Sequence, residues 1–217
     1  MKLTIDIPSS LNDITLGQYK EFLNIQKNIK DEKFLEVKMI EIFCNLKSSQ
    51  VMLLKVKDSE KISKIINDIF DKKPKLVTHF KIKNKEYGFH PQLDELTLGE
   101  YIDLDTYIGD WENMEKTMNV LYRPVIAKLK DKYSIDEYKV ETSEALLNMP
   151  MDAVLSSIFF FWNLGLDLSK AMTDCLEGEE LEALMQDQIS QTDGDGGQAF
   201  SLYSLNQILD ELKISLN

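Results

Sequence analysis

The sequence has little of what several large classes of protein depend on. It holds only two cysteines, Cys44 and Cys175, both in apolar segments, so neither a disulfide framework nor a cysteine zinc site is expected. Arg123 is the only arginine, although arginine is the side chain best suited to bidentate recognition of phosphates and bases. Together with a formal net charge of −12, this predicts a chain that does not bind nucleic acid.

Long apolar runs and catalytic motifs are also missing. The most apolar stretch, residues 153–166, is interrupted by two serines and an asparagine and is shorter than the roughly 20 residues that cross a bilayer. No Walker A sequence, GxGxxG fingerprint or CxxC pair occurs, and the only histidines are His79 and His90, both in one predicted hairpin. We therefore expect a protein that is not an enzyme, has no cofactor and does not insert into a membrane.

An internal repeat is the most informative feature that is present. Residues 11–25, LNDITLGQYKEFLNI, align without a gap on residues 93–107, LDELTLGEYIDLDTY. Most changes between the two segments are conservative. The identical pairs are Leu11 and Leu93, Thr15 and Thr97, Leu16 and Leu98, Gly17 and Gly99, and Tyr19 and Tyr101. We interpret the segments as two copies of one duplicated motif.

Each copy carries the pattern of a helix start. Thr-x-x-Gln in the first copy and Thr-x-x-Glu in the second are capping boxes, in which each side chain bonds to the other residue's free backbone amide. A strand-like segment precedes each copy, at residues 3–7 and 86–89. A second helix is expected after each copy, around Leu35 and Trp111. The repeated unit is therefore predicted to be strand, turn and capped helix.

Further helices and one hairpin follow from local patterns. An isoleucine stripe predicts a helix that begins at Asp58 or Ser59. Segments on either side of Lys83-Asn84-Lys85 predict a hairpin with an aromatic face. A central helix is expected to begin at Pro150 and to end at Gly165, followed by a short helix to Leu176.

The predicted fold is α+β and predominantly helical. We expect two related strand, turn and capped-helix units around a small antiparallel sheet or hairpin, followed by C-terminal helices. The expected boundaries are residues 1–75 for the first unit, 76–177 for the second and elaborated unit, 178–199 for an acidic glycine-rich linker, and 200–217 for an amphipathic C-terminal helix.

Two apolar clusters are candidates for contact with a partner protein. One is the run of aromatic residues in the predicted central helix, and the other is the apolar face of the C-terminal helix. The candidate residues are Phe159, Phe160, Phe161, Trp162, Leu205, Ile208, Leu209 and Leu212. Burial in the core is the competing interpretation of the aromatic run, and it is the commoner fate of such residues.

Acidic residues are plentiful around the second motif, where paired carboxylates would be able to hold a divalent cation. Their helical spacing favours a solvated face instead. The run Asp193–Gly197 differs from a calcium loop because its glycine is misplaced and Ser204 stands where a bidentate glutamate would fall. No metal site is therefore predicted.

Several segments resemble a family of small proteins from tailed bacteriophages. They are TLGQYKEFL, LTLGEYIDLDTYIGDWENMEKTMNVLYRPV, KYSIDEY, NMPMDAVLSSIFFFWNLGLDLSK and the terminal LKISLN, so the resemblance covers nearly the whole chain. It implies a protein of the structural and tail-assembly gene module, either a tail or neck component of the virion or an assembly chaperone in the host cytoplasm. The implied partners are other phage structural proteins or further copies of this chain. The resemblance assigns no catalytic residue.

Two other classes of function compete with this one. A phage-encoded acidic inhibitor would block a host protein by imitating nucleic acid, but its acids would have to be aligned, and here they are scattered. A metal-dependent enzyme would need the acids of the second motif to converge in one pocket, which helical spacing alone does not achieve.

Overall fold

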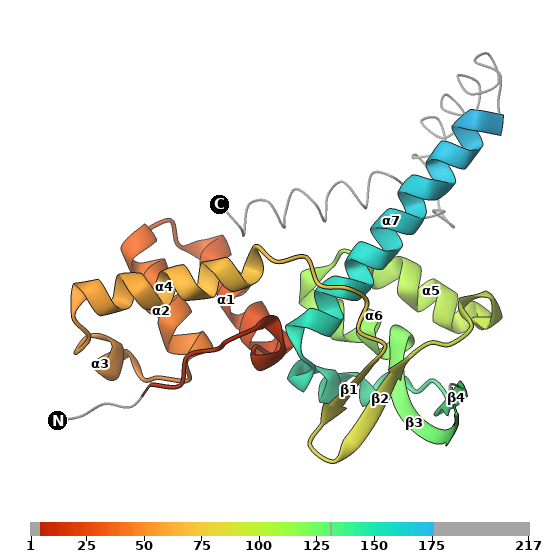
Figure 1. Ribbon diagram of the computed structural model, residues 1–217, viewed down its shortest axis with the longest axis horizontal. Coiled ribbons are helices and arrows are strands. Elements are labelled where there is room, and N and C mark those ends of the chain that lie inside the picture. Colours follow the sequence, from red (N-terminus) through yellow and green to blue (C-terminus); the bar gives the residue numbers. More distant parts are fainter. Residues whose placement is uncertain (1–4, 131, 176–217) are drawn as a thin grey trace.

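The computed structural model describes residues 5–130 and 132–175 and has the mostly helical α+β fold that the sequence predicts (Figure 1). Two groups of helices flank a long helix, and a four-stranded antiparallel sheet lies beneath the second group. The predicted linker and C-terminal helix, with Leu205, Ile208, Leu209 and Leu212, lie outside the described residues.

The N-terminal group consists of helices that pack around α2. Its members are η1 (Leu11–Asp13), α1 (Leu16–Asn28), α2 (Glu32–Phe43), α3 (Ser48–Val51) and α4 (Val56–Phe70). The predicted second and third helices are confirmed, and the third begins at Val56, before the predicted Asp58 or Ser59. Asp31 caps α2 by accepting a bond from the Phe34 amide at 3.0 Å. The predicted first strand is wrong where it is described, because residues 5–7 pair with no other strand and instead pack Ile5 and Ile7 against the core.

The sheet is an antiparallel meander in the order β1-β2-β3-β4. Its strands are β1 (His79–Ile82), β2 (Lys85–Phe89), β3 (Tyr122–Leu129) and β4 (Lys132–Ile135). The first two form the predicted hairpin, whose turn has Lys83 at a φ of 54°. Phe80 lies opposite Tyr87, and their rings stack at 5.5 Å. These two residues and Phe89 are buried, which confirms the predicted aromatic face.

The second copy of the motif is inserted between two neighbouring strands, β2 and β3. The insertion contains η2 (Leu93–Glu95), α5 (Leu98–Tyr107), η3 (Trp111–Asn113) and α6 (Met114–Leu121). Helix α6 ends just before Arg123 and Pro124, as predicted, but the chain continues directly into β3. Tyr122 at this junction is fully buried and donates a hydrogen bond to the Val77 carbonyl at 2.7 Å.

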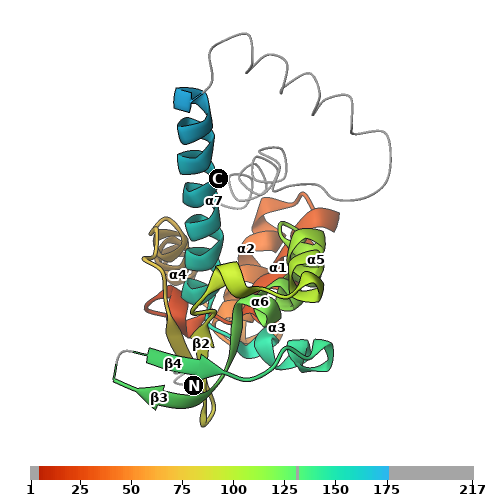
Figure 2. The same cartoon turned by 90° about the vertical axis from the view of Figure 1, so that its right-hand side faces the viewer.

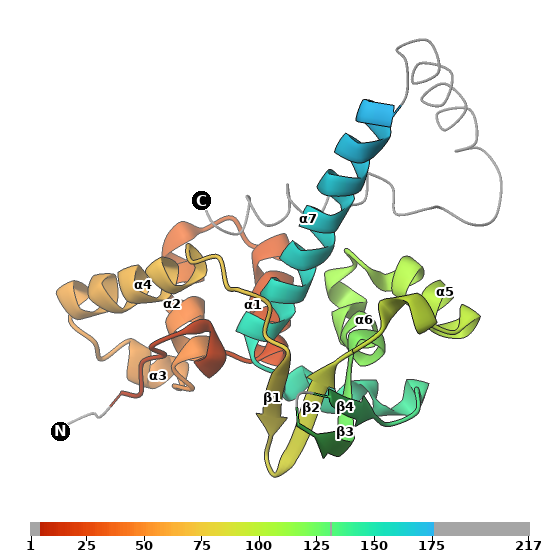
Figure 3. The same cartoon turned by 45° about the vertical axis from the view of Figure 1, so that its right-hand side comes forward.

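Helix α7 (Met151–Cys175) follows η4 (Val140–Asn148) and stands between the two groups of helices (Figure 3). It is buried from Met151 to Ile158 except at Asp152, and its later turns extend beyond both groups (Figures 1 and 2). The predicted end at Gly165 is wrong, because one glycine costs a helix only about 1 kcal/mol and the helix continues without a break. None of the described helices has the length and hydropathy to cross a bilayer.

The two copies of the motif have the same local structure. A 3-10 turn precedes each, and both predicted capping boxes are formed: the Thr15 hydroxyl accepts from the Gln18 amide at 3.2 Å, and that of Thr97 accepts from the Glu100 amide at 3.3 Å. Helices α2 and α6 begin at the same separation along the chain from their threonines. The duplication therefore extends to both helices of each pair.

The glycine shared by the two motifs has different surroundings in each copy. A Cβ atom added at Gly17 would lie 3.0 Å from the carbonyl oxygen of Leu147, whereas one added at Gly99 would meet no atom within 4 Å. Glycine allows the close approach of a second backbone, and elsewhere it weakens a helix. Gly17 therefore has a packing reason within the chain, and Gly99 has none among the described residues.

We predict that alanine has opposite effects at these glycines. Gly17→Ala should lower the free energy of unfolding, because the Leu147 backbone would have to move away. Gly99→Ala should raise it by about 0.5–1 kcal/mol, because alanine is the better helix former and the space is open. Urea denaturation of both variants measures the difference. Equal changes at the two sites would contradict it.

Candidate interaction surface on helix α5

The aromatic residues that the sequence singles out lie along the middle of α7. Phe161 is buried, and Phe159 and Phe160 are half-buried against the core. The ring of Phe160 meets that of Phe89 edge-on at 5.7 Å. Trp162 is half-buried and is not among the residues that pack on the core. Core packing thus accounts for Phe161, and a partner contact by the other three stays a prediction.

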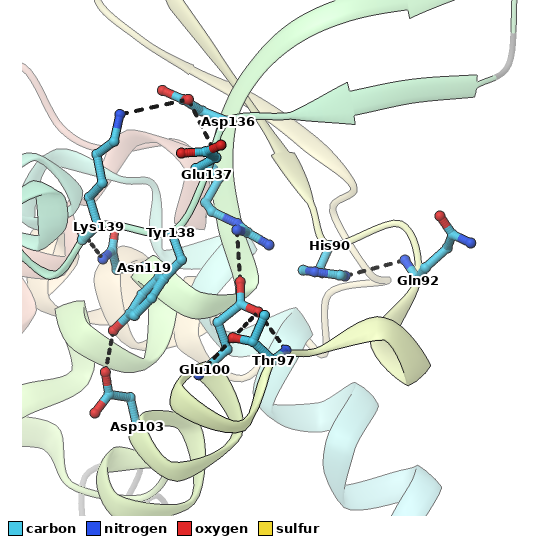
Figure 4. Close-up of polar contacts among 11 residues, drawn as sticks. His90, Gln92, Thr97, Glu100, Asp103, Asn119, Asp136, Glu137, Tyr138 and Lys139 are labelled. Atoms are coloured by element: carbon cyan, nitrogen blue, oxygen red, sulfur yellow. Dashed lines mark hydrogen bonds and ion pairs between the residues drawn. The ribbon is translucent and has the colours of Figure 1, made fainter.

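Helix α5 is fixed to the sheet by its inner face. Glu100, the third residue of the helix, is only 3% exposed. One of its carboxylate oxygens accepts bonds from the amide and hydroxyl of Thr97 at 2.7 and 2.8 Å. The other lies 2.8 Å from Nη1 of Arg123 on β3 (Figure 4). The one arginine of the chain therefore forms a buried ion pair with the second capping box.

The electrostatics around this pair keep it ionised. Burial alone would raise the pKa of Glu100, but the bonds from Thr97 and the charge of Arg123 outweigh burial and hold this pKa below its usual value. Burial and the nearby Arg123 both lower the pKa of His90, whose Nδ1 accepts a bond from the Gln92 amide at 3.3 Å. His90 is therefore neutral near pH 7 and adds no second cation.

A second polar contact holds the next turn of α5. The Tyr138 hydroxyl donates a bond to the carboxylate of Asp103 at 2.5 Å, and burial together with this carboxylate raises the pKa of Tyr138. The same loop is tied to α6 where the Asn119 amide group donates to the Lys139 carbonyl at 2.8 Å (Figure 4). The inner side of α5 is thus held at two successive turns.

The outer face of α5 is apolar and exposed. Leu98, Tyr101 and Ile102 are 75%, 41% and 52% exposed, and their spacing places them side by side on one face of the helix. In the first copy, the equivalent Leu16 and Tyr19 are only 0% and 4% exposed. The same residue types therefore belong to the core in one copy and face solvent in the other.

Carboxylates surround this face. Asp94 and Glu95 are exposed in the 3-10 turn before α5. Asp105 lies one turn beyond Tyr101 and Ile102 and is half-buried, so burial raises its pKa. A ligand that covers the apolar residues would meet negative charge at both ends of the helix. The face therefore favours a ligand with cationic groups at its margins.

The residues gathered on α5 have the chemistry of a polypeptide contact, an apolar centre with a charged margin. Within the described part of the chain, no three His, Cys, Asp or Glu side chains come together in a way that would hold a metal ion. Comparisons of the chain with protein-family models, with curated proteins and with solved structures found no match. The role of this surface is therefore inferred from its own geometry and chemistry.

Sequence reasoning identified neither the exposed face nor the buried ion pair. A signal for the pair was present, because the capping residue changes from Gln18 to Glu100 between the copies while the chain has a single arginine. No such signal existed for the exposed face, since both copies carry leucine and tyrosine at the positions concerned. Only the packing of segments distant in sequence makes these residues buried in the first copy and exposed in the second.

We predict strong energetic coupling between Glu100 and Arg123. Arg123→Met should lower the free energy of unfolding by about 3–5 kcal/mol, because it leaves a carboxylate buried without its counter-charge. Glu100→Gln keeps the capping-box geometry seen at Gln18 but leaves Arg123 unpaired. The double variant should therefore lose less stability than the sum of the single variants, as measured by a double-mutant cycle in urea. Additive losses would be evidence against the pair.

The Glu100–Arg123 pair should also make the free energy of unfolding depend on pH. The pKa of Glu100 is lowered by folding, so its contribution is complete above the unfolded value of about 4.3 and disappears as the pH falls through the folded pKa. Below about pH 4, the wild type should lose more stability than the Glu100→Gln/Arg123→Met double variant. Thermal unfolding followed between neutral and acidic pH tests this, and parallel curves for the two proteins would contradict it.

Proposed function

We propose that the chain is a non-enzymatic protein of the structural and tail-assembly module of a tailed phage, and that it binds another protein through the exposed face of α5. The observation that supports this is the contrast between the two motif copies. A face that the fold covers in the first copy is left open in the second, with Leu98 and Tyr101 in place of the buried Leu16 and Tyr19.

The energetics favour a covered state for this face. Burial of one large aliphatic side chain is worth about 1.5–3 kcal/mol, and Leu98, Tyr101 and Ile102 are adjacent. A cluster of this kind has the character of a contact hot spot, which lies at the centre of a larger and more polar interface. The rigid attachment of α5 through Glu100 presents these side chains without further ordering of the helix, which reduces the entropic penalty of binding.

The place of the protein in the phage rests on the sequence resemblance. A tail or neck component would remain in the finished particle. An assembly chaperone would be left behind in the host cytoplasm, and an acidic inhibitor would associate with a host protein. The proposal is the first of these, with α5 as the surface that contacts a neighbouring virion protein.

The test is quantitative mass spectrometry of purified particles beside the lysate of infected cells. We expect this chain in the particles at a fixed ratio to the major capsid protein. We expect Leu98→Asp to reduce its incorporation, because the apolar contact is lost while aspartate in the first turn suits the helix. Leu53→Asp is the matched control, since Leu53 is 74% exposed far from α5. Abundance in the lysate with absence from particles would overturn the virion role, and equal incorporation of both variants would overturn the role of α5.

A further inference from the structure

The first copy of the motif shows what covers the start of such a face, whereas Tyr19 further along packs on the rings of Phe70 and Trp111. Between the end of η4 and the start of α7, the chain crosses the start of α1 in a short extended link, with Met149 at φ −73° and ψ 149°. The Leu16 amide donates to the Met149 carbonyl at 2.9 Å, and the Met151 amide donates to the Ile14 carbonyl at 2.9 Å. Thr15 and Pro150 lie opposite each other as an antiparallel bridge. A short extended link between two helices thus pairs with the backbone of the motif.

The side chains at this crossing allow the two backbones to approach closely. The Leu147 carbonyl passes directly over Gly17, where there is no Cβ atom to obstruct it. Leu16, Met149 and Met151 are completely buried at the contact. The glycine admits the crossing backbone, and the leucine belongs to the same buried core as Met149 and Met151.

The second copy retains these features, and none of the described residues occupies them. Leu96 and Leu98 correspond to Ile14 and Leu16, and among the described residues neither the Leu98 amide nor the Leu96 carbonyl has a hydrogen-bond partner. An amide at the first position of a helix has none within the helix itself. Gly99 is retained although no atom lies within 4 Å of where its Cβ would be.

The geometry points to this face as the docking site for an aliphatic segment of a partner protein that is extended where it crosses the motif. Its backbone pairs with the Leu98 amide and the Leu96 carbonyl and passes over Gly99, as residues 147–151 do at the first copy. This inference rests on the proposed function for its choice of surface and adds the conformation and chemistry of the partner.

The negative charge around α5 indicates which residues flank the segment and which protein supplies it. Asp94 and Glu95 on one side and Asp105 on the other call for lysine or arginine at the margins of the ligand. A second copy of this chain fits poorly, because its net charge of −12 is repulsive. Its own residues of this kind, Met149 and Met151, are also buried in the core. The inference therefore commits to a segment of a different protein as the occupant.

The test uses nuclear magnetic resonance of the full ¹⁵N-labelled chain. The ligand is a synthetic peptide that carries residues 145–151, Ala-Leu-Leu-Asn-Met-Pro-Met, with lysines at both ends. We expect saturable shifts of the Leu98, Gly99 and Tyr101 amides. Replacing the flanking lysines by glutamates should weaken binding, and a peptide of scrambled order should produce no saturable shift.

A variant at Gly99 separates docking from folding. Gly99 is exposed and a Cβ atom added there meets no atom within 4 Å, so we expect Gly99→Leu to fold as the wild type does while its side chain occupies the path of the segment. We expect it to weaken peptide binding by about tenfold or more, a change of about 1.4 kcal/mol or more in binding free energy. Leu53→Asp should bind the peptide as the wild type does.

The outcomes distinguish this inference from the proposed function. Absence of saturable shifts, or equal binding by Gly99→Leu, overturns the extended-segment site, even if Leu98→Asp still removes the protein from particles. Peptide binding together with normal incorporation of Leu98→Asp leaves the docking site standing and overturns the virion contact. Shifts of the same amides on raising protein concentration without peptide would mean that a second copy is the occupant, which contradicts the inference.

Discussion

The backbone pairing between the first motif and the segment before α7 is the contact on which the other parts of the fold depend. It joins residues near the two ends of the described chain and fixes the first turn of α7 against α1. With α7 in this position, the two groups of helices also meet each other. Tyr19 packs on Trp111 at 5.0 Å, and Lys20 reaches Glu112 and Glu115. The core is therefore completed by contacts between residues far apart in sequence, whose loop-closure entropy opposes their formation.

A single position in each capping box links the two helices of its copy. Gln18 extends from the first turn of α1 to the Ile42 carbonyl at 2.8 Å, near the end of α2. Glu100 extends in the same way from α5 to Arg123, just beyond the end of α6. The duplicated geometry is thus kept while its chemistry changes from a neutral amide to a buried ion pair. A buried carboxylate requires a partner that remains charged, and arginine meets this requirement better than lysine.

Local patterns in the sequence predicted the elements whose stability is local. The capped helices, the hairpin around Lys83 and the end of α6 before Pro124 follow from caps, turns and helix-stopping residues close in sequence. Strands β3 and β4 were not foreseen, because β3 contains Pro124 and its later residues are exposed, so it lacks a clear apolar alternation. Helix α7 continues through Gly165 because one glycine is only a weak helix breaker. The exposure of Leu98 depends on tertiary packing, which the identical residues of the two motifs do not encode.

Helix α7 is held at one end and projects at the other (Figures 1 and 3). With a rise of about 1.5 Å per residue, the helix is about 37 Å long. Any neighbour that pushes sideways on its outer turns therefore applies a torque at the embedded end, where Pro150 lies against Thr15. The fold is in this sense a lever with its pivot at the first motif. Mechanical load on the projecting end would reach the interior where the start of α7 pairs with the first motif.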